Sequence, residues 1–145
     1  MKTELRVRLA RNKDEIRQVF EIRDKVFGEE QGISRELDYD GNDKLAEQVI
    51  AYGESTPIGC ARIRIIDGKG KLERIAVLKE FRGNGFGGKI VNYLVKYCKR
   101  KKLTEIYFDA QAYLENFYKE FGFEVTGKPF EEVGRPHVKM RMKLK

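Results

Sequence analysis

Hydrophobic residues recur at every second position, or in short apolar runs, along about seven segments of the chain. This spacing predicts β-strands, because successive side chains of a strand point to opposite faces of a sheet. Turn residues separate the segments, and "DGKG" (67–70) is a strong hairpin signal. The expected strands cover 4–10, 46–53, 57–66, 71–77, 105–110, 123–127 and 137–145.

Elsewhere the apolar residues lie three or four positions apart, which predicts amphipathic helices. The first helix is expected over 13–27, where Asn12 can cap its N-terminus. The second follows a glycine-rich stretch and runs to about residue 101, and a short third helix ends at Gly122. Polar, acidic and glycine-punctuated residues fill 28–43, and we expect this long loop to form a substrate wall.

These elements follow one another in the order β-α-β-β-β-α-β-α-β-β. The order predicts a single α/β domain over 1–145, in which helices flank a mixed, largely antiparallel sheet of about seven strands. The last two strands are expected to form a hairpin around a longer loop.

The composition indicates a globular protein, with 41% hydrophobic and 11% aromatic residues. No apolar run is long enough to span a bilayer, and the first residues, "MKTELRVRLARNKDEI", lack the apolar stretch of a signal peptide. We therefore expect a soluble, cytoplasmic protein without a membrane partner.

Few side chains are suited to holding a metal. Cys60 and Cys98 lie within apolar patterns and lack C-x-x-C spacing, which indicates reduced, buried cysteines. His137 is the one histidine of the chain, so zinc chemistry is not expected. We predict no metal site.

The net charge of +7 suits a polyanionic partner, either a nucleic acid or a multiply phosphorylated cofactor. The basic run "KYCKRKK" (96–102) falls at the end of a predicted helix, where cations face water and complement the helix dipole. We favour that interpretation over nucleic-acid binding, because no nucleic-acid module is recognisable.

Three phosphate-binding patterns overlap in "EFRGNGFGGKIV" (80–91). Gly83, Gly85 and Gly88 match the G-x-G-x-x-G of dinucleotide loops, and the segment from Gly83 to Lys89 matches most of a nucleotide P-loop. The segment "RGNGFG" (82–87) matches R-x-x-G-x-G, the pyrophosphate loop of acyl-CoA-dependent acyltransferases.

The context of the loop excludes the first two patterns. A dinucleotide loop directly follows its strand in a βαβ unit that opens the domain, whereas 78–82 separate this loop from its strand. Asp109 has nearly the spacing of a ribose ligand, but too few residues follow it to complete a doubly wound sheet. A P-loop needs Ser or Thr where this chain has Ile90. The acyl-CoA pattern remains, in which glycine N–H groups converge on a pyrophosphate and Arg82 adds charge.

The segment "LERIAVLKEFRGNGFGGKIVNYLV" (72–95) resembles the acetyl-CoA-binding segment of the GNAT N-acetyltransferase superfamily. "ENFYKEFGFE" (115–124) resembles the second signature of that family, F-Y-x-x-x-G-F. "VFGEEQGI", "DAQAYLENFYKEFGF" and "RPHVKMRM" are similar to the bacterial ElaA-like and YjcF-like branch. The resemblance covers essentially the whole chain and implies acetyl transfer from acetyl-CoA to an amine.

The resemblance also implies a set of cofactor-binding residues. Backbone groups of the strand before the loop would pair with the pantetheine arm, and the loop would cradle the phosphates. Many relatives carry an asparagine at the position of Gln111, and here we favour Asn116 over Gln111 as the side chain that reaches the cofactor. The implied residues are Ile75, Ala76, Val77, Arg82, Gly83, Asn84, Gly85, Phe86, Gly87, Gly88, Gln111 and Asn116.

Amide formation from a thioester needs a neutral amine, a stabilised oxyanion and a proton for the departing thiolate. By resemblance Tyr118 would supply that proton, although its apolar neighbours also fit a core residue. Strand alternation places Glu73 on the face of Ile75 and Val77 as a candidate base, and a salt bridge with Arg62 or Arg64 is an equal alternative. His137 is a further catalytic candidate.

Three polar residues of the long loop, Glu30, Gln31 and Asp38, are candidates for binding a cationic acceptor, with simple exposure to water as the alternative. Two functions of different classes follow. The favoured one is acyl transfer from acetyl-CoA to a primary amine of a small molecule or a protein. The other is a non-catalytic module that senses CoA or binds nucleic acid. The oligomeric state stays open, with a homodimer through exposed sheet edges as one outcome.

Overall fold

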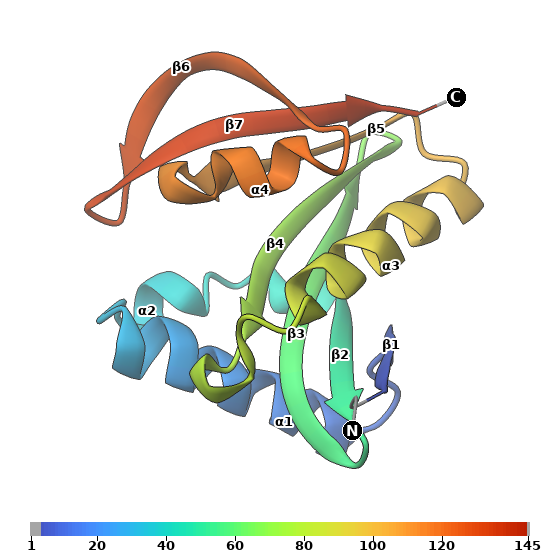
Figure 1. Ribbon diagram of the computed structural model, residues 1–145, viewed down its shortest axis with the longest axis vertical. Coiled ribbons are helices and arrows are strands. Elements are labelled where there is room, and N and C mark those ends of the chain that lie inside the picture. The colour runs from blue at the N-terminus through green and yellow to red at the C-terminus, as the bar shows by residue number, and fades with distance from the viewer. Residues whose placement is uncertain (1–3, 145) are drawn as a thin grey trace.

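The computed structural model of the protein describes residues 4–144 and is built around one seven-stranded sheet (Figure 1). The strand order is β1-β2-β3-β4-β5-β7-β6. All neighbours are antiparallel except β4 and β5, which are parallel, so the mixed sheet expected from the sequence is confirmed. The strands are β1 (Leu5–Leu9), β2 (Glu47–Gly53), β3 (Thr56–Ile66), β4 (Lys69–Val77), β5 (Glu105–Gln111), β6 (Glu124–Glu132) and β7 (Arg135–Lys143).

The helices pack on both faces of this sheet. They are α1 (Lys13–Arg23), α2 (Arg35–Asp38), α3 (Phe86–Arg100) and α4 (Glu115–Lys119), with the π-helical segment η1 (Asp24–Glu30) and the short turns η2 (Asp43–Leu45), η3 (Lys79–Phe81) and η4 (Ala112–Leu114). Asn12 caps α1 as predicted, because its side chain accepts the Glu15 N–H at 2.9 Å. No helix within 4–144 is long and apolar enough to cross a membrane.

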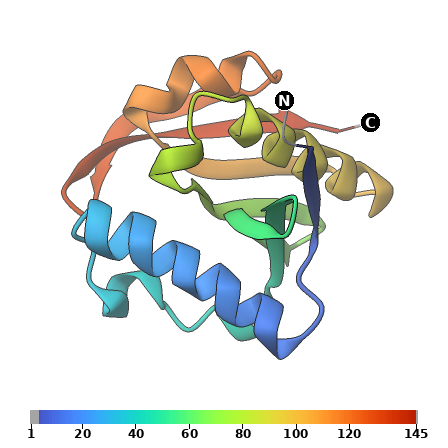
Figure 2. The same cartoon turned by 60° about the horizontal axis from the view of Figure 1, so that its bottom comes forward.

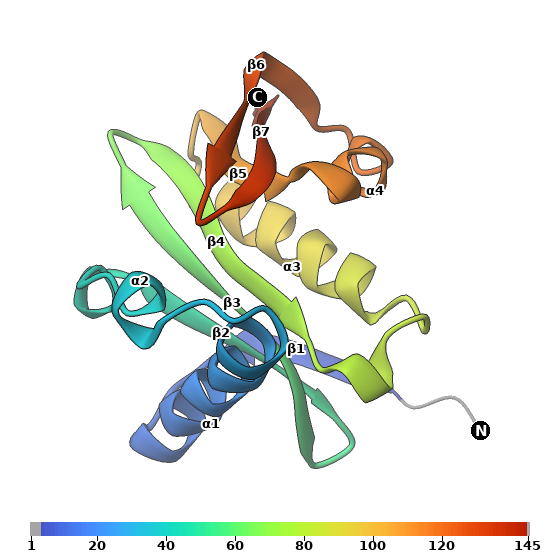
Figure 3. The same ribbon diagram turned by 90° about the vertical axis from the view of Figure 1, so that its left-hand side faces the viewer.

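Figures 2 and 3 show α1 and α2 on one side of the sheet and α3 and α4 on the other. We call these sides the α1 face and the α3 face. Each side holds its own cluster of buried apolar residues, with Val19 and Ile22 in the α1-face cluster and Ile90 and Leu94 in the α3-face cluster. Helix α1 packs against β2, β3 and β4, and α3 packs against β1, β3 and β4, so the middle of the sheet lies between the two layers.

Buried ion pairs hold the long loop before β2 against the sheet. Arg23 is fully buried and binds Asp38 at 3.3 Å and Asp43 at 2.7 Å. Arg62 of β3, equally buried, binds Asp40 at 2.9 Å and Asp43 at 3.1 Å. The loop is therefore not irregular throughout, as the sequence suggested, because it contains η1, α2 and η2, and the carboxylates of Asp38 in α2 and Asp43 in η2 are held by buried arginines.

Strand β4 contains a β-bulge at Arg74. On β3 one residue separates Cys60 from Arg62, whereas on β4 two residues separate their partners Ala76 and Glu73. Arg74 has a φ of 55°, in the left-handed region that side chains other than glycine rarely adopt. The extra residue reverses the alternation of the strand at this point.

Strands β4 and β5 separate after a short parallel pairing. Their paired residues end at Lys71 and Tyr107, so the second half of β4 lies apart from the end of β5. On its other side β5 pairs with β7 along its whole length. The sheet is therefore open between β4 and β5 at one end.

The final hairpin is longer than predicted. A two-residue turn at Val133 and Gly134, both with positive φ, joins β6 to β7, so the expected longer loop is wrong. Residue 145, the last residue of the predicted strand, lies outside the described residues.

Candidate active site

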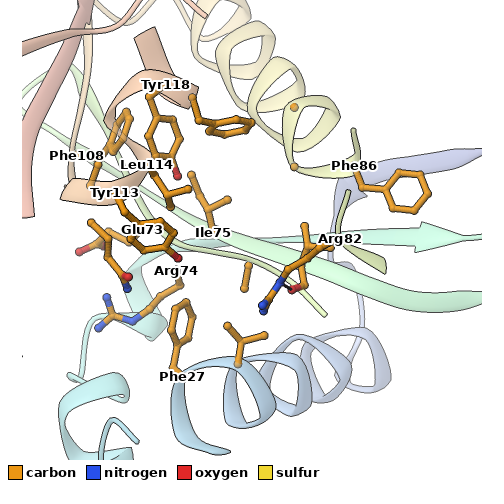
Figure 4. A pocket seen from close by; sticks show the side chains of 18 of the residues that line it. Phe27, Glu73, Arg74, Ile75, Arg82, Phe86, Phe108, Tyr113, Leu114 and Tyr118 are labelled. Atoms are coloured by element: carbon orange, nitrogen blue, oxygen red, sulfur yellow. Dashed lines mark hydrogen bonds between the residues drawn. The ribbon is translucent and has the colours of Figure 1, made fainter. Parts of the chain in front are cut away.

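A cavity of about 580 Å³ fills the opening between β4 and β5 (Figure 4). Its walls come from both faces of the sheet. On the α3 face they are the glycine-rich loop, the start of α3, and η4 with α4. On the α1 face the walls combine apolar side chains, among them Val26 and Phe27, with a polar group. We call this polar group the polar end; it consists of Gln31, Glu73, Asp109, Gln111 and His137. Two molecules can therefore meet here from opposite faces.

The glycine-rich loop is shaped to leave its backbone open. Gly83 and Gly85 have φ values of 82° and 78°, which glycine adopts without strain. A Cβ atom at either position would meet no other atom within 4 Å, so these backbones border open space. The N-terminal N–H groups of α3 follow directly after Gly85. Such an end has a positive dipole and favours phosphate.

Arg82 joins this loop to two other segments. Its Nε donates to the Val77 carbonyl at 2.9 Å, and its two terminal nitrogens donate to the Glu30 carboxylate at 2.5 and 2.7 Å. The hydrogen bonds from Arg82 hold the pKa of Glu30 below its ordinary value. Glu30, a predicted acceptor residue, is thus paired with Arg82 and does not border the cavity.

Tyr118 places a buried ring beside the cavity. The side chain is 5% exposed, and its ring packs edge-to-face against Phe108, Phe117 and Phe123. Figure 4 shows its oxygen directed towards Ile75 and away from these rings. Burial raises the pKa of Tyr118 above its ordinary value, so the phenol keeps its proton at neutral pH.

The predicted position of Glu73 on the face of Ile75 and Val77 is wrong, because the bulge at Arg74 intervenes. Glu73 pairs with Arg62 and lies on the α1 face, whereas Ile75 and Val77 pack on the α3-face cluster. Its carboxylate binds Arg64 at 2.7 Å and Arg62 at 2.9 Å. The salt bridge proposed as the alternative is thus present, and Glu73 still borders the cavity.

Those ion pairs decide the protonation of Glu73. Burial alone would raise its pKa, but the hydrogen bonds from Arg64 and the charges of Arg62 and Lys71 lower it below the ordinary value. A carboxylate stabilised in this way is a weak base.

Gln111, and not Asn116, lies on the cavity wall. Its Nε2 donates to Gln31 Oε1 at 3.0 Å, and its Oε1 is buried without a hydrogen-bond partner in the described chain. Asn116 is exposed on α4, on the side of the helix away from the cavity. The structure therefore does not support our preference for Asn116, because Asn116 lies two residues before Tyr118 and so points to nearly the opposite side of α4.

His137 is buried at the polar end, where it pairs with Gln111 across β5 and β7. Its Nδ1 lies 2.8 Å from the Arg135 carbonyl, and since a carbonyl only accepts, Nδ1 carries the proton. Nε2 is then the ring nitrogen that can accept a proton. Glu132 Oε2 lies 3.7 Å from it.

Of the remaining predicted residues, most border the cavity and two, Asn84 and Asp38, do not. The backbone and loop residues expected to hold the cofactor border the cavity, with the exception of Asn84, whose side chain donates to the Phe81 carbonyl and shapes the turn. Asp38 is 4% exposed and pairs with Arg23 and Arg74, so its predicted contact with an acceptor is wrong. Its charge instead stabilises the long loop through these two ion pairs.

Several wall residues were not predicted from the sequence, among them Phe27, Arg74, Asp109, Tyr113 and Leu114. Asp109 could have been found from its position near the carboxyl end of the predicted strand 105–110. That strand follows the helix that begins at the glycine loop. Phe27 closes the apolar stripe of the first helix, where the predicted wall loop begins. No pattern marked Arg74, because a residue with a side chain at a positive φ has no sequence signature.

A phosphate-binding loop on one face and a polar recess on the other, joined through an opened sheet, define an acyltransferase that brings a CoA thioester and an acceptor together. Within residues 4–144 no group of three or more His, Cys, Asp or Glu is placed to hold a metal ion.

Comparison with known proteins agrees with this class. A model of the acetyltransferase (GNAT) domain matches residues 13–144. The N-acetyltransferase YjcF of Bacillus subtilis is 35% identical over 133 residues, which cover 91% of this chain and 95% of that protein. The crystal structure of Escherichia coli ElaA matches 98% of this chain and 100% of its own, with 25% identity and a TM-score of 0.86. A GNAT family acetyltransferase from Elizabethkingia anophelis with acetyl-CoA bound matches 99% of this chain and 100% of its own, with 18% identity and a TM-score of 0.74.

The chain belongs to the acetyltransferase (GNAT) family, in its ElaA-like and YjcF-like branch. It is an acetyltransferase, and the resemblance found in the sequence is confirmed.

Proposed function

We propose that the protein transfers the acetyl group of acetyl-CoA directly to a primary amine, with the donor on the α3 face and the amine on the α1 face. The observation that carries this proposal is the cavity between β4 and β5, which has a glycine loop at one end and polar side chains at the other. Acetyl-CoA supplies an acetyl group activated as a thioester. The residues derived below bind and orient the two reactants and move the protons.

The loop end fits the donor. The open backbones of Gly83 and Gly85, the first turn of α3 and the charge of Arg82 are what a pyrophosphate requires. Beside the loop, the second half of β4 has no strand partner on its β5 side, which leaves backbone groups of Ile75 and Val77 for the amides of a pantetheine arm. The bulge at Arg74 re-aims neighbouring N–H groups, and we propose these as donors to the oxyanion.

Two residues are proposed to move protons. Tyr118 is the general acid for the departing thiolate, since its phenol stays protonated and its oxygen faces the cavity. His137 is the better candidate for the base, because its Nε2 is free to accept and Glu73 is stabilised as a carboxylate by two arginines. A covalent acetyl-cysteine is not required: Cys60 is fully buried, and burial raises its pKa to about 12.

Two properties of the whole protein are part of the proposal. We propose a cytoplasmic location, supported by Cys60 and Cys98, which are free and lie in clusters on opposite faces of the sheet. A homodimer through the edge strand β1 or β6 also stays a prediction, which light scattering can test.

The experiment that tests the function measures thiol release from acetyl-CoA with a panel of amines, with mass spectrometry of the products. We expect a product that is heavier by one acetyl group, and we expect Gly87→Ala to lose acetyl-CoA binding. A Cβ atom at Gly87 would lie at ordinary contact distance from Phe117, 3.6 Å, so the variant should fold while the methyl group narrows the cavity. Gly28→Ala, where a Cβ meets nothing within 4 Å, is the matched control.

Acetyl-CoA binding without turnover on any amine would contradict the proposed reaction and favour a non-catalytic role. Normal acetyl-CoA binding by a folded Gly87→Ala variant would contradict the assignment of the loop.

A further inference from the structure

The charged side chains that line the cavity differ in how they are neutralised. Within residues 4–144 these are Glu73, Arg74, Arg82 and Asp109, besides His137. Glu73 pairs with Arg62 and Arg64, Arg74 with Asp38 at 2.8 Å, and Arg82 with Glu30. Asp109 makes neither an ion pair nor a side-chain hydrogen bond with the rest of the described chain. It is the carboxylate that the fold leaves for a ligand.

The position of Asp109 follows from the strand register. β4 and β5 are last paired at Lys71 and Tyr107, and Asp109 lies two residues beyond, where the strands part. Phe108 and Ala110 belong to the α3-face cluster, so Asp109 between them points to the α1 face. Its side chain therefore lies at the polar end, where the proposed amine enters.

Among residues 4–144, no Lys, Arg or His side chain forms an ion pair with Asp109. Lys139 is its partner across β5 and β7, but that side chain is exposed and forms no ion pair with it among residues 4–144. The neighbouring Glu73 is negative, and the buried Oε1 of Gln111 also lacks a donor. The polar end thus offers unsatisfied acceptors. A partly desolvated carboxylate in such surroundings is stabilised when a cation binds beside it.

That cation is not the amine that is acetylated. The attacking nitrogen must be neutral, and a bound carboxylate favours its protonated form. Asp109 therefore suits a second nitrogen of the same molecule, which stays charged while the first one reacts. We infer that Asp109 binds a distal ammonium group of the acceptor, so that the substrates of this protein are diamines, polyamines or amines of similar charge. This inference rests on the proposed function and deepens it.

The test compares probes of matched length with acetyl-CoA as donor. 1,3-Diaminopropane, 1,4-diaminobutane and 1,5-diaminopentane are each measured against the monoamine with the same carbon chain, and 5-aminopentanoate supplies a distal negative charge. We expect kcat/KM of the preferred diamine to exceed that of its monoamine by about tenfold or more, with the aminopentanoate the poorest acceptor.

Asp109→Asn keeps the shape of the side chain and removes its charge. We expect this variant to lose most of the diamine preference while kcat/KM for the monoamine stays within about threefold, as for a contact made only by the second nitrogen. Glu105→Gln is the matched control, since it removes a carboxylate from the same face of β5 and borders a separate hollow. We expect the Glu105→Gln variant to keep the preference for diamines over monoamines. We expect Lys139→Met, which removes the cation opposite Asp109, to keep or increase that preference.

Two results would overturn the inference even if amines are acetylated: equal kcat/KM for diamines and monoamines in the wild type, or a preference that survives Asp109→Asn. An equal loss for both kinds of amine in that variant also overturns it and makes Asp109 a group acting on the reacting nitrogen. If none of the probes is acetylated the inference fails as well, and the binding of acetyl-CoA to the wild type then shows whether the donor site fails with it.

Discussion

Tyr118 and Glu73 show how strongly the roles of single residues depend on their immediate contacts. The tyrosine could be predicted from a short motif, because the stripe of α4 fixes which side chains face inward. The face of Glu73 could not, since strand alternation holds only while the strand is regular and Arg74 adds a residue without any glycine to mark it. Sequence reasoning thus found the proposed acid, Tyr118, and put Glu73 on the wrong face of β4.

At this scale we predict that Tyr118→Phe removes the proton donor and little else. The ring keeps its packing against Phe108 and Phe123, so the melting temperature and acetyl-CoA affinity should be close to wild type. The value of kcat should fall by about 10²-fold or more, in an assay where chemistry limits the rate. Tyr93→Phe on α3, away from the cavity, is the control. If Tyr118→Phe turned over at nearly the wild-type rate, the proposed role of Tyr118 as general acid would be contradicted and its role would be structural only.

Among the elements, the long loop before β2 differs most from its sequence-based description. Its acidic residues suggested an exposed wall for a cationic acceptor, yet Asp38, Asp40 and Asp43 bind Arg23 and Arg62. The partners lie on α1 and β3, and nothing in the local sequence connects them. Strand and helix positions could be predicted because periodicity is local, whereas these ion pairs depend on long-range contacts.

We predict that this network makes the protein sensitive to acid. Burial alone would raise the pKa of Asp43, but hydrogen bonds from Arg23, Gln48 and Arg62 lower it. A carboxylate with a lowered folded-state pKa stabilises the protein fully above its unfolded-state pKa of about 4, and that stability is lost as the pH falls through the folded value. The free energy of unfolding, measured with urea from pH 7 towards pH 3, should therefore decline below about pH 4.

Asp43→Asn should lower the free energy of unfolding at pH 7 by roughly 3 kcal/mol or more, because two buried arginines lose a partner. Its decline in acid should be shallower than that of the wild type. Asp14→Asn removes an exposed carboxylate from α1 and should change stability by less than about 1 kcal/mol. Identical acid profiles for wild type and Asp43→Asn would contradict the prediction.

For the whole molecule, the sequence predicted the class of fold, the loop end of the cavity and four candidates that lie at the polar end. The structure was needed to find Asp109 and to show that these residues lie together. The loop is one continuous segment with its own pattern. The polar end combines Gln31 with residues of β4, β5 and β7, which only the folded chain brings together.

Ligand selectivity tests the whole assembly. Acetyl-CoA binds the folded form alone and should raise the melting temperature by several degrees at about 100 times its Kd. NAD and ATP with Mg²⁺ should give little stabilisation at the same concentrations, because the loop has neither a dinucleotide unit around it nor a hydroxyl for Mg²⁺ after Lys89. Differential scanning fluorimetry measures all three. Comparable stabilisation by NAD or by ATP with Mg²⁺ would contradict the assignment of residues 82–87 as an acyl-CoA pyrophosphate loop.

The bulge at Arg74 also affects how this chain should be aligned with other proteins. An alignment that preserves regular alternation along β4 will be one residue out of step on one side of Arg74. It will then match Glu73 with residues of the α3 face, or Ile75 and Val77 with residues of the α1 face. Residue roles can be transferred along this strand only from proteins that share the insertion, and for the others the two halves of β4 need to be aligned separately.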